Sequence, residues 1–236
     1  MFLQNLSDTS IISGLFNGQT FSDSQIQNCV FDGAQINSTV WNDISMRDTN
    51  ANDMQFTRAH FVSSNISRSS LMNTSFSDCR LETLALSGVT LIKTRWLHVR
   101  SYRSSITQCT LQRCVIKDSM YVDSLFSDFE GINASVENCF FQTTRFEITY
   151  GGGMNGFSGA ELKNCIFYGC TFTGFPLRGA ILENCTFINC RGEITDDCEG
   201  TNVYGLPRFC AQPAKTALTQ RGQAAELISI YRTTKK

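Results

Sequence analysis

Residues 56–81 read FTRAH-FVSSN-ISRSS-LMNTS-FSDCR-L, and the first residue of every group of five is large and apolar. The same period starts at Leu6 and continues to Phe146. Three positions in that range miss it: Ala51, Ser101 and Gly131. A smaller residue, most often Ser, Thr, Cys or Ala, stands two positions before most of the large ones. Self-similarity at a fixed short period is the signature of a repeat architecture.

A period of five matches neither an amphipathic helix, with its period of 3.6, nor an alternating strand, with its period of 2. The chain must therefore turn a corner within every repeat. If each group forms one side of a square, four groups close a coil of twenty residues. The large residue then fills the axis, and the smaller one lies against the inner wall. We expect an all-β solenoid whose coils stack about 4.8 Å apart and bury apolar side chains only against their neighbours.

Several groups carry a family resemblance: NCVFD (28–32), DCRLE (78–82), QCTLQ (108–112), NCFFQ (138–142) and NCTFI (184–188). They resemble the pentapeptide repeats of the right-handed quadrilateral parallel β-helix family. The resemblance covers residues 6–146 and 157–190. It implies that fold, whereas function varies within the family. Some members resemble the quinolone-resistance Qnr type, which binds DNA gyrase as a DNA mimic, and others are secreted as effectors by bacterial pathogens.

The period divides the chain into segments. Residues 1–5 are expected to form an amino-terminal cap, and residues 6–146 a first block of coils. The Gly-rich stretch 147–156 interrupts the period, which resumes at Phe157 displaced by one position, so we expect one inserted residue. A second block covers residues 157–192.

Beyond the second block the repeat fades. Residues 193–212 are expected to be irregular, and residues 213–232 to form a helix that begins near Pro213. Its apolar face includes Leu218, Leu227, Ile228 and Tyr231. This helix either caps the last coil or pairs two chains in a homodimer, as carboxy-terminal segments do in Qnr-like proteins.

Nine of the eleven cysteines occupy the small inward class: Cys29, Cys79, Cys109, Cys114, Cys139, Cys165, Cys170, Cys185 and Cys190. A thiol there packs as a small apolar group. Their spacings of five reflect the repeat, and no tight pair of the kind that zinc sites use is present. We therefore predict free thiols, no metal site and no cofactor. So many free thiols favour a reducing compartment.

The charges are balanced, with 20 basic and 21 acidic residues, so direct nucleic-acid binding is not expected. No apolar run is long enough to span a membrane, and the first residues lack a secretory signal. The sequence favours a cytoplasmic protein. Export by a specialised injection system is the alternative, because its signal need not be apolar.

Two stretches are candidate partner-binding sites. The segment 93–113 is the most basic part of the chain and supplies Lys93, Arg95, His98, Arg100, Arg103 and Arg113. Stacking by twenty residues predicts Lys93 beside Arg113, His98 beside Asp118 and Arg103 beside Asp123. A solvated face with partial charge pairing is the alternative interpretation.

The second candidate is the Gly-rich loop. Its residues Tyr150, Met154 and Asn155 are candidates by resemblance, because projecting loops engage the enzyme in Qnr-like proteins. A structural defect between two blocks of coils explains the loop equally well.

A solenoid with a filled axis offers no catalytic cleft, so the sequence does not predict an enzyme. The main hypothesis is a non-catalytic protein-binding or adaptor solenoid, including a bacterial secreted effector. The first alternative is a DNA mimic that binds gyrase or topoisomerase IV through acidic residues such as Asp23, Asp43 and Asp53. The second is a structural component of a larger assembly.

Overall fold

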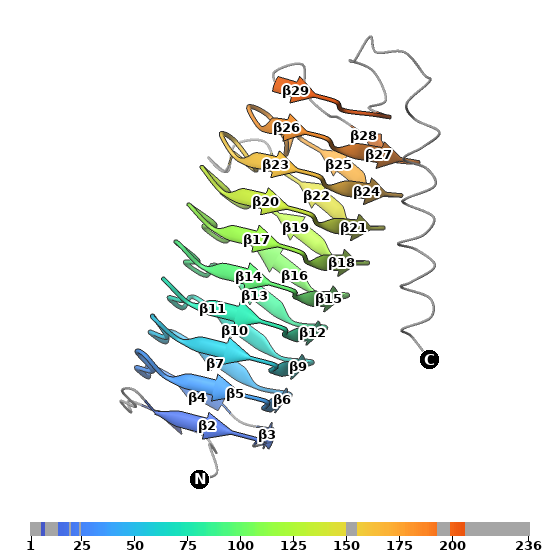
Figure 1. The fold of residues 1–236 in the computed structure, drawn as a ribbon. Coiled ribbons are helices and arrows are strands. Elements are labelled where there is room, and N and C mark those ends of the chain that lie inside the picture. Colours follow the sequence, from blue (N-terminus) through green and yellow to red (C-terminus); the bar gives the residue numbers. More distant parts are fainter. Residues whose placement is uncertain are drawn as a thin grey trace.

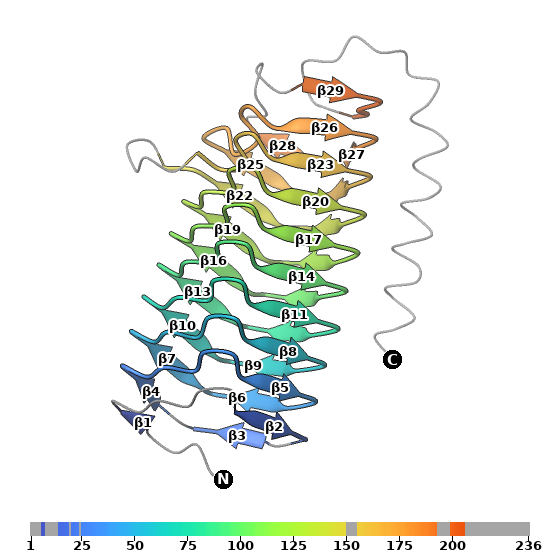
Figure 2. The same cartoon turned by 60° about the vertical axis from the view of Figure 1, so that its left-hand side comes forward.

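In the computed structural model the described residues are 6–7, 14–18, 20–23, 25–149, 155–192 and 199–205. They form an all-β parallel solenoid of about eight turns, in which every regular element of the described residues is a strand. The coils stack in sequence order along one axis, with the first coil at one end and β29 at the other (Figures 1 and 2). The solenoid fold predicted from the period of five is confirmed.

Three sides of the coil are parallel sheets. The β1 sheet has ten strands: β1 (Leu6–Ser7), β4 (Gln25–Gln27), β7 (Ser45–Arg47), β10 (Asn65–Ser67), β13 (Ala85–Ser87), β16 (Ser105–Thr107), β19 (Leu125–Ser127), β22 (Arg145–Glu147), β25 (Thr171–Thr173) and β28 (Arg191–Gly192). The β2 sheet also has ten: β2 (Leu15–Asn17), β5 (Gln35–Asn37), β8 (Gln55–Thr57), β11 (Ser75–Ser77), β14 (Arg95–Leu97), β17 (Val115–Lys117), β20 (Ser135–Glu137), β23 (Glu161–Lys163), β26 (Ile181–Glu183) and β29 (Glu199–Thr201). The β3 sheet has nine: β3 (Thr20–Ser22), β6 (Val40–Asn42), β9 (His60–Val62), β12 (Arg80–Glu82), β15 (Arg100–Tyr102), β18 (Met120–Val122), β21 (Phe140–Gln142), β24 (Ile166–Tyr168) and β27 (Thr186–Ile188).

The register between coils is twenty residues through most of the stack. Phe56 pairs with Phe76, and Phe76 with Trp96, along the β2 sheet. The fourth side is made of turns joined by single bridges between coils, such as the one between Val30 and Asn50. Each coil is therefore a four-sided ring that hydrogen-bonds to the rings above and below it.

Aromatic side chains fill the axis. Phe141 stacks on Phe167 with ring centroids 4.9 Å apart, and Phe167 stacks on Phe187 at 4.6 Å. These rings are buried, as are the two Trp side chains. The indole Nε1 of Trp41 donates a hydrogen bond to Thr39 at 3.0 Å, so the polar atom of this buried ring is satisfied.

The corners explain why the chain can turn every five residues. The residue two positions after most large inward residues has a positive φ close to 50°, for example Asn138, Asn164 and Asn184. Asn, Asp and Gly tolerate this left-handed conformation better than other residues. Arg and Ser also occupy corners, as at Arg58 and Ser38. The cost of these corners must be offset by the packing inside and by the backbone hydrogen bonds between coils.

The positions that miss the period still point inward. Ala51 and Ser101 are buried, as are the larger residues Val99 and Phe129 at the inward position two before Ser101 and Gly131. Phe129 packs edge-on against Phe157 with centroids 4.8 Å apart. A Cβ on Gly131 would lie 2.9 Å from the Phe157 ring, so the missing side chain leaves room for neighbouring rings.

The insertion in the Gly-rich stretch is six residues, which corrects the expectation of one. Val136 pairs with Leu162, and Phe141 with Phe167, both at a register of 26 instead of 20. An insertion of one residue and an insertion of six shift the period by the same single position, because an added whole repeat leaves the phase unchanged. The displaced period therefore does not distinguish the two lengths. The observed insertion equals one repeat and one further residue.

The segment 193–212, expected to be irregular, contributes a further strand. In it β29 pairs with β26, and Leu182 lies opposite Gly200 at a register of 18. The apolar period is lost there because a glycine takes the inward position, while Val203 remains buried. Residues 1–5 and 213–232, expected to form a cap and a helix, lie outside the described residues.

Candidate interaction surface

The polar groups inside the coil are engaged with the backbone. Ser64, Thr74 and Cys79 each donate a hydrogen bond to a carbonyl oxygen of the preceding coil, to Trp41 at 3.0 Å, Ala51 at 2.9 Å and Phe56 at 3.4 Å. The small inward position therefore ties one coil to the next. These groups have a structural role and are shielded from any ligand in solution.

The nine cysteines predicted to point inward are free, and all except the half-buried Cys190 are fully buried. Burial raises the pKa of Cys79 to about 12 and that of Cys109 to about 11, so these thiols stay neutral. No group of three or more His, Cys, Asp or Glu residues able to hold a metal is found among the described residues. Nor do they form a helix long and apolar enough to cross a membrane.

Cys139, Cys165 and Cys185 lie in successive coils at the same inward position of the β3 sheet. The backbone N–H of Ile166 bonds to the Cys139 carbonyl, and that of Thr186 to the Cys165 carbonyl, both at 2.9 Å. Counting twenty residues along the sequence places Cys165 next to Cys185 but does not reach Cys139, because the insertion lies between Cys139 and Cys165.

The basic segment 93–113 spreads around the coil, since twenty residues make one full turn. Three of its cations come together: Lys93 and Arg113 occupy the same corner of successive coils, and Arg95 begins the β2-sheet strand after that corner. All three are exposed, and no ion pair within the described ranges involves them. We call these three residues the cationic corner.

The other predicted basic residues face elsewhere. Arg100 begins β15 on the β3 sheet, and Arg103 lies at the corner that follows it. His98 lies at the corner between the β2 and β3 sheets. Its Nδ1 is 3.4 Å from Asp78 and its Nε2 is 3.7 Å from Asp118, so the predicted contact with Asp118 is confirmed and a second carboxylate is added.

The corner of His98 continues upward as a ladder of side-chain amides. The Nδ2 of Asn138 donates to Asp118 at 2.9 Å, and Asn164 donates to Asn138 at 3.0 Å. Asn184 donates to Asn164 at 3.2 Å, and Asn202 to Asn184 at 3.0 Å. We call the residues Asp118, Asn138, Asn164, Asn184 and Asn202 the amide ladder. These bonds between successive coils give the corner a structural role.

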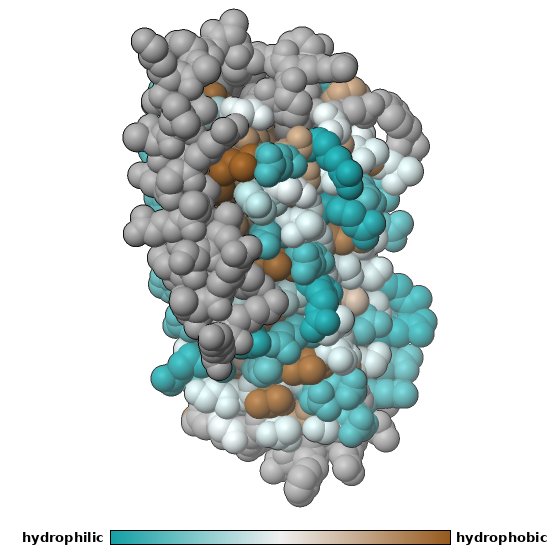
Figure 3. All heavy atoms as spheres, turned by 90° about the vertical axis from the view of Figure 1, so that its right-hand side faces the viewer, coloured by the Kyte–Doolittle hydropathy of each residue, from teal (hydrophilic) through white to brown (hydrophobic). Residues whose placement is uncertain are grey.

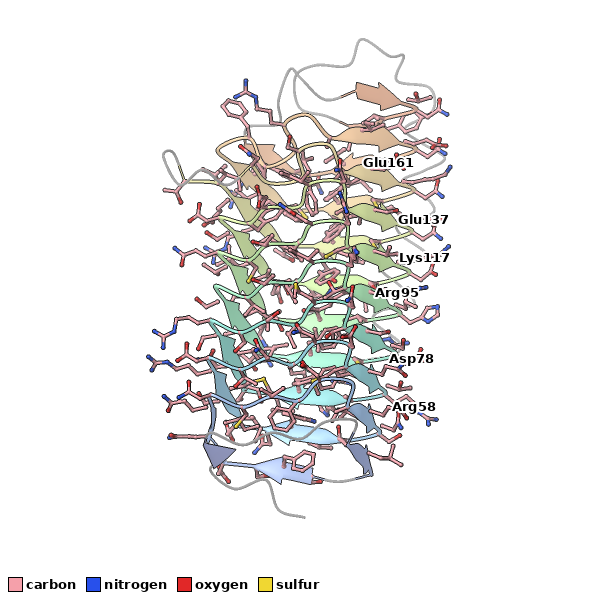
Figure 4. The ribbon with its side chains drawn as sticks, turned by 90° about the vertical axis from the view of Figure 1, so that its left-hand side faces the viewer. Arg58, Asp78, Arg95, Lys117, Glu137 and Glu161 are labelled. Carbon is pink, nitrogen blue, oxygen red and sulfur yellow. The ribbon has the colours of Figure 1, made fainter. Side chains whose placement is uncertain are left out.

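Charges of both signs follow one another along the outer face of the β2 sheet and the corner that follows it. Figure 4 shows its labelled residues in coil order along one edge of the solenoid: Arg58, Asp78, Arg95, Lys117, Glu137 and Glu161. The Lys117 ammonium lies 3.0 Å from Glu137, whose carboxylate raises the pKa of Lys117. Lys163 and Glu183 repeat this contact at 3.0 Å. Next to these paired charges, the cationic corner stands out as uncompensated.

A comparable pairing occurs at the corner after the β1 sheet. Arg68 approaches Asp48 at 2.7 Å, and this hydrogen bond is the main cause that lowers the pKa of Asp48. Arg47 contacts the same carboxylate at 3.2 Å.

The loop and acidic candidates are less clustered. Tyr150 and Met154 lie outside the described residues, and Asn155 is exposed, with its carbonyl accepting from the N–H of Ser158 at 3.2 Å. The carboxylates proposed for DNA mimicry do not form one column. Asp23 and Asp43 share a corner, whereas Asp53 lies at a different one.

The outer face of the β3 sheet is apolar in its upper half, a feature that the sequence reasoning missed. Of the eight outward positions of β18, β21, β24 and β27, two hold the polar residues Gln142 and Thr186, and six hold Met120, Val122, Phe140, Ile166, Tyr168 and Ile188. We call these six residues the apolar stripe. Figure 3 looks onto this side of the stack, where brown apolar side chains lie among polar ones. Reading the outward positions at intervals of twenty, with the insertion counted as six, would have revealed it.

The repeat, the four-sided coil and the inward Cys, Ser and Thr class define a pentapeptide-repeat solenoid. Residues 157–191 match the family described as pentapeptide repeats (8 copies). The assignment made from the sequence is confirmed: the chain is a pentapeptide-repeat protein.

Solved structures of similar proteins were also found. One is HetL, a pentapeptide repeat protein involved in heterocyst differentiation regulation from the cyanobacterium Nostoc sp. strain PCC 7120. It is 15% identical, with 78% of this chain and 88% of HetL covered and a TM-score of 0.47. Another is QnrB1, a plasmid-mediated fluoroquinolone resistance protein, at 14% identity, 91% and 97% coverage and a TM-score of 0.41. No curated protein sequence matches the chain significantly.

Proposed function

We propose that this chain is a non-catalytic protein-binding module that uses its outer surface, with the cationic corner as the main contact. The observation that carries the proposal is the exposure of Lys93, Arg95 and Arg113 next to one another without carboxylate partners in the described residues. The β sides of the coil are hydrogen-bonded on both edges, so they present these cations on a rigid frame. Rigid presentation lowers the entropic cost of binding.

The chemistry of the corner indicates an acidic partner. Carboxylate-rich protein segments are attracted by three neighbouring cations, and electrostatic complementarity raises the association rate and selects the partner. Inside the coil the inward polar groups already donate to backbone carbonyls, as Ser64 and Thr74 do. Recognition is therefore assigned to the outward side chains.

The test is affinity capture from a bacterial lysate and from a eukaryotic cell lysate, with the captured proteins identified by mass spectrometry. The variant Lys93→Glu/Arg95→Glu/Arg113→Glu should recover the partner at least tenfold less. The matched control Arg58→Glu/Arg100→Glu/Arg103→Glu changes the net charge equally but at other sides of the coil, and it should retain the partner. Equal losses in both variants would mean that net charge alone governs binding and would refute the cationic corner.

The identity of the captured protein separates the narrower functions. Gyrase or topoisomerase IV subunits would assign the DNA-mimic function, and a host protein would assign the effector function. A third variant lacking residues 150–155 removes the loop that contains Tyr150, Met154 and Asn155 while restoring a twenty-residue register. Loss of the partner in this variant alone would show that the loop, and not the cationic corner, makes the main contact.

A further inference from the structure

The outward side chains of the β3 sheet are buried to an extent that the other two sheets do not show. Val122 is 3% exposed and Phe140 is 7% exposed, although both alternate with inward residues and point away from the axis. By contrast, no outward side chain described in the β1 or β2 sheet is buried, and Ile181 on the β2 sheet is 44% exposed. The local geometry of the strands is the same in all three sheets, so it does not explain the difference.

Polar atoms on the same face point to the same conclusion. The Oε1 atom of Gln142, at the outward end of β21, is buried and has no hydrogen-bond partner among the described residues. The Nε2 atom of His60, on β9 of this sheet, is also buried, and it lies 3.7 Å from the Glu82 carboxylate. An outward amide oxygen would normally be hydrated, so its burial indicates that something covers the face.

The path of the chain identifies what covers it. The last described residues return to this side: the N–H of Tyr204 donates to the Cys185 carbonyl at 2.9 Å, and its carbonyl accepts from Phe187 at 2.8 Å. The thirty-one residues that follow Gly205 therefore start beside Ile188, at the upper end of the apolar stripe. Among them, residues 213–232 carry the sequence pattern of a helix with one apolar face.

The lengths agree. The face from Tyr102 to Ile188 spans four steps between coils, or about 19 Å at the usual strand spacing. A helix of twenty residues is about 30 Å long, enough to cover these coils and to continue over β9 and β12. Eight residues, 205–212, are available to reverse the chain direction between the last coil and the helix.

We propose that residues 213–232 dock as an amphipathic helix lengthwise along the outer face of the β3 sheet of the same chain, with the face that carries Leu218, Leu227, Ile228 and Tyr231 toward the sheet and the first half of the helix over the apolar stripe. The helix covers a side of the solenoid, and it neither closes the last coil nor pairs two chains. The docked helix leaves the β2 sheet and the cationic corner exposed. The proposal is independent of the proposed function.

The first experiment places the photo-crosslinking amino acid p-benzoylphenylalanine at position 228, or at position 219 on the opposite side of the helix. A mixture of nitrogen-15-labelled and unlabelled chains is irradiated, and crosslinked peptides are identified by mass spectrometry. Position 228 lies about 22 Å from the start of the helix and should crosslink to peptides containing Glu82, Arg100 or Tyr102 within one chain, at least tenfold more than position 219. Crosslinks that join labelled to unlabelled chains would show a second copy as the occupant and overturn the proposal, as would equal yields from both positions.

A second experiment avoids the unnatural residue. Phe140→Asp places a charge under the helix without touching the inward Phe141, and Val115→Asp is the matched outward change on the β2 sheet. Trypsin should cut after Lys215 and Arg221 at least tenfold faster in Phe140→Asp than in Val115→Asp, while the solenoid keeps its circular dichroism. Equally rapid cleavage of the carboxy-terminal segment in the unmodified chain and both variants would refute docking.

Discussion

Corner residues differ in how much room they leave for a side chain. Gly169 has a φ of +62°, and a Cβ built on it meets nothing within 4 Å. Gly174 has a φ of +69°, but a Cβ there would collide with the carbonyl of Ile148. The left-handed conformation alone does not require glycine in this fold, since Asn, Asp and other non-glycine residues occupy most equivalent corners. Glycine is required only where a neighbouring coil approaches the Cα.

We therefore predict that Gly174→Ala lowers the free energy of unfolding by at least 2 kcal/mol more than Gly169→Ala, on the order of an overpacking penalty. Gly169→Ala should cost about 1 kcal/mol, the price of a left-handed alanine. Gly169→Asn should cost less still, because asparagine tolerates this conformation. Urea unfolding followed by circular dichroism measures all three. Similar losses for the two alanine variants would show that backbone conformation, and not the contact with Ile148, demands the glycine.

The buried thiols should lower the free energy of unfolding at alkaline pH. Burial raises the pKa of Cys79 to about 12 and that of Cys109 to about 11, against about 8.5 for a thiol in an unfolded chain. The neutral thiol is favoured in the folded state, so its contribution is complete below about pH 8.5. It is lost as the pH rises toward the folded pKa. In that window each thiol should lower the free energy of unfolding by about 1.4 kcal/mol per pH unit.

Urea unfolding at several pH values between 8 and 11 tests this expectation. The double variant Cys79→Ala/Cys109→Ala is the control, because alanine occupies the same inward class at Ala59 and Ala134. Its stability should fall less steeply with pH than that of the unmodified chain. Parallel slopes would mean that the alkaline loss comes from other groups.

The amide ladder links the same corner of successive coils by side-chain hydrogen bonds. Asn164 both donates to Asn138 at 3.0 Å and accepts from Asn184 at 3.2 Å, so replacing it removes two bonds at once. A net hydrogen bond contributes about 1 kcal/mol, and less when exposed. Asn164→Ala should therefore destabilise the solenoid by about 1 kcal/mol more than Asn133→Ala, which changes an equivalent corner outside the ladder. Chemical denaturation measures the difference. If the two variants lose equal stability, the ladder contributes nothing and only the corner conformation matters.

The inward half of each strand could be predicted from the sequence, and the outward half only partly. An inward residue such as Phe76 packs between residues exactly one coil away, so a local period reveals it. The contact between His98 and Asp118 follows from the same twenty-residue step. The bond from Asn164 to Asn138 crosses the insertion at a separation of 26, and a period known only modulo five does not place it. The apolar stripe was missed for the same reason, since its members lie on both sides of the insertion.

For the whole molecule, the insertion decides which side of the upper coils stacks on which side of the lower ones. With an insertion of six residues, Leu162 pairs with Val136 and the three sheets continue through the whole stack. With an insertion of one residue, Leu162 would lie opposite Phe141, and every later strand would move to the neighbouring side of the coil. The composition of the outer faces, including the apolar stripe and the charges of the β2 sheet, therefore depends on this register.

Engineered cysteine pairs can test the register directly. Asn138→Cys/Asn164→Cys places two thiols at stacked corners whose amides now lie 3.0 Å apart, within reach of a disulfide. Mild oxidation should link this pair in nearly all molecules, as detected by mass spectrometry of proteolytic peptides. The pair Asn138→Cys/Gly159→Cys has the separation of 21 that a one-residue insertion requires, and it should remain reduced because Gly159 lies at another corner, near Asn133. Oxidation of the second pair in preference to the first would refute the six-residue register. The half-buried Cys190, together with Cys198 and Cys210, is replaced with Ser in both variants, and the eight buried native thiols are shielded from the oxidant.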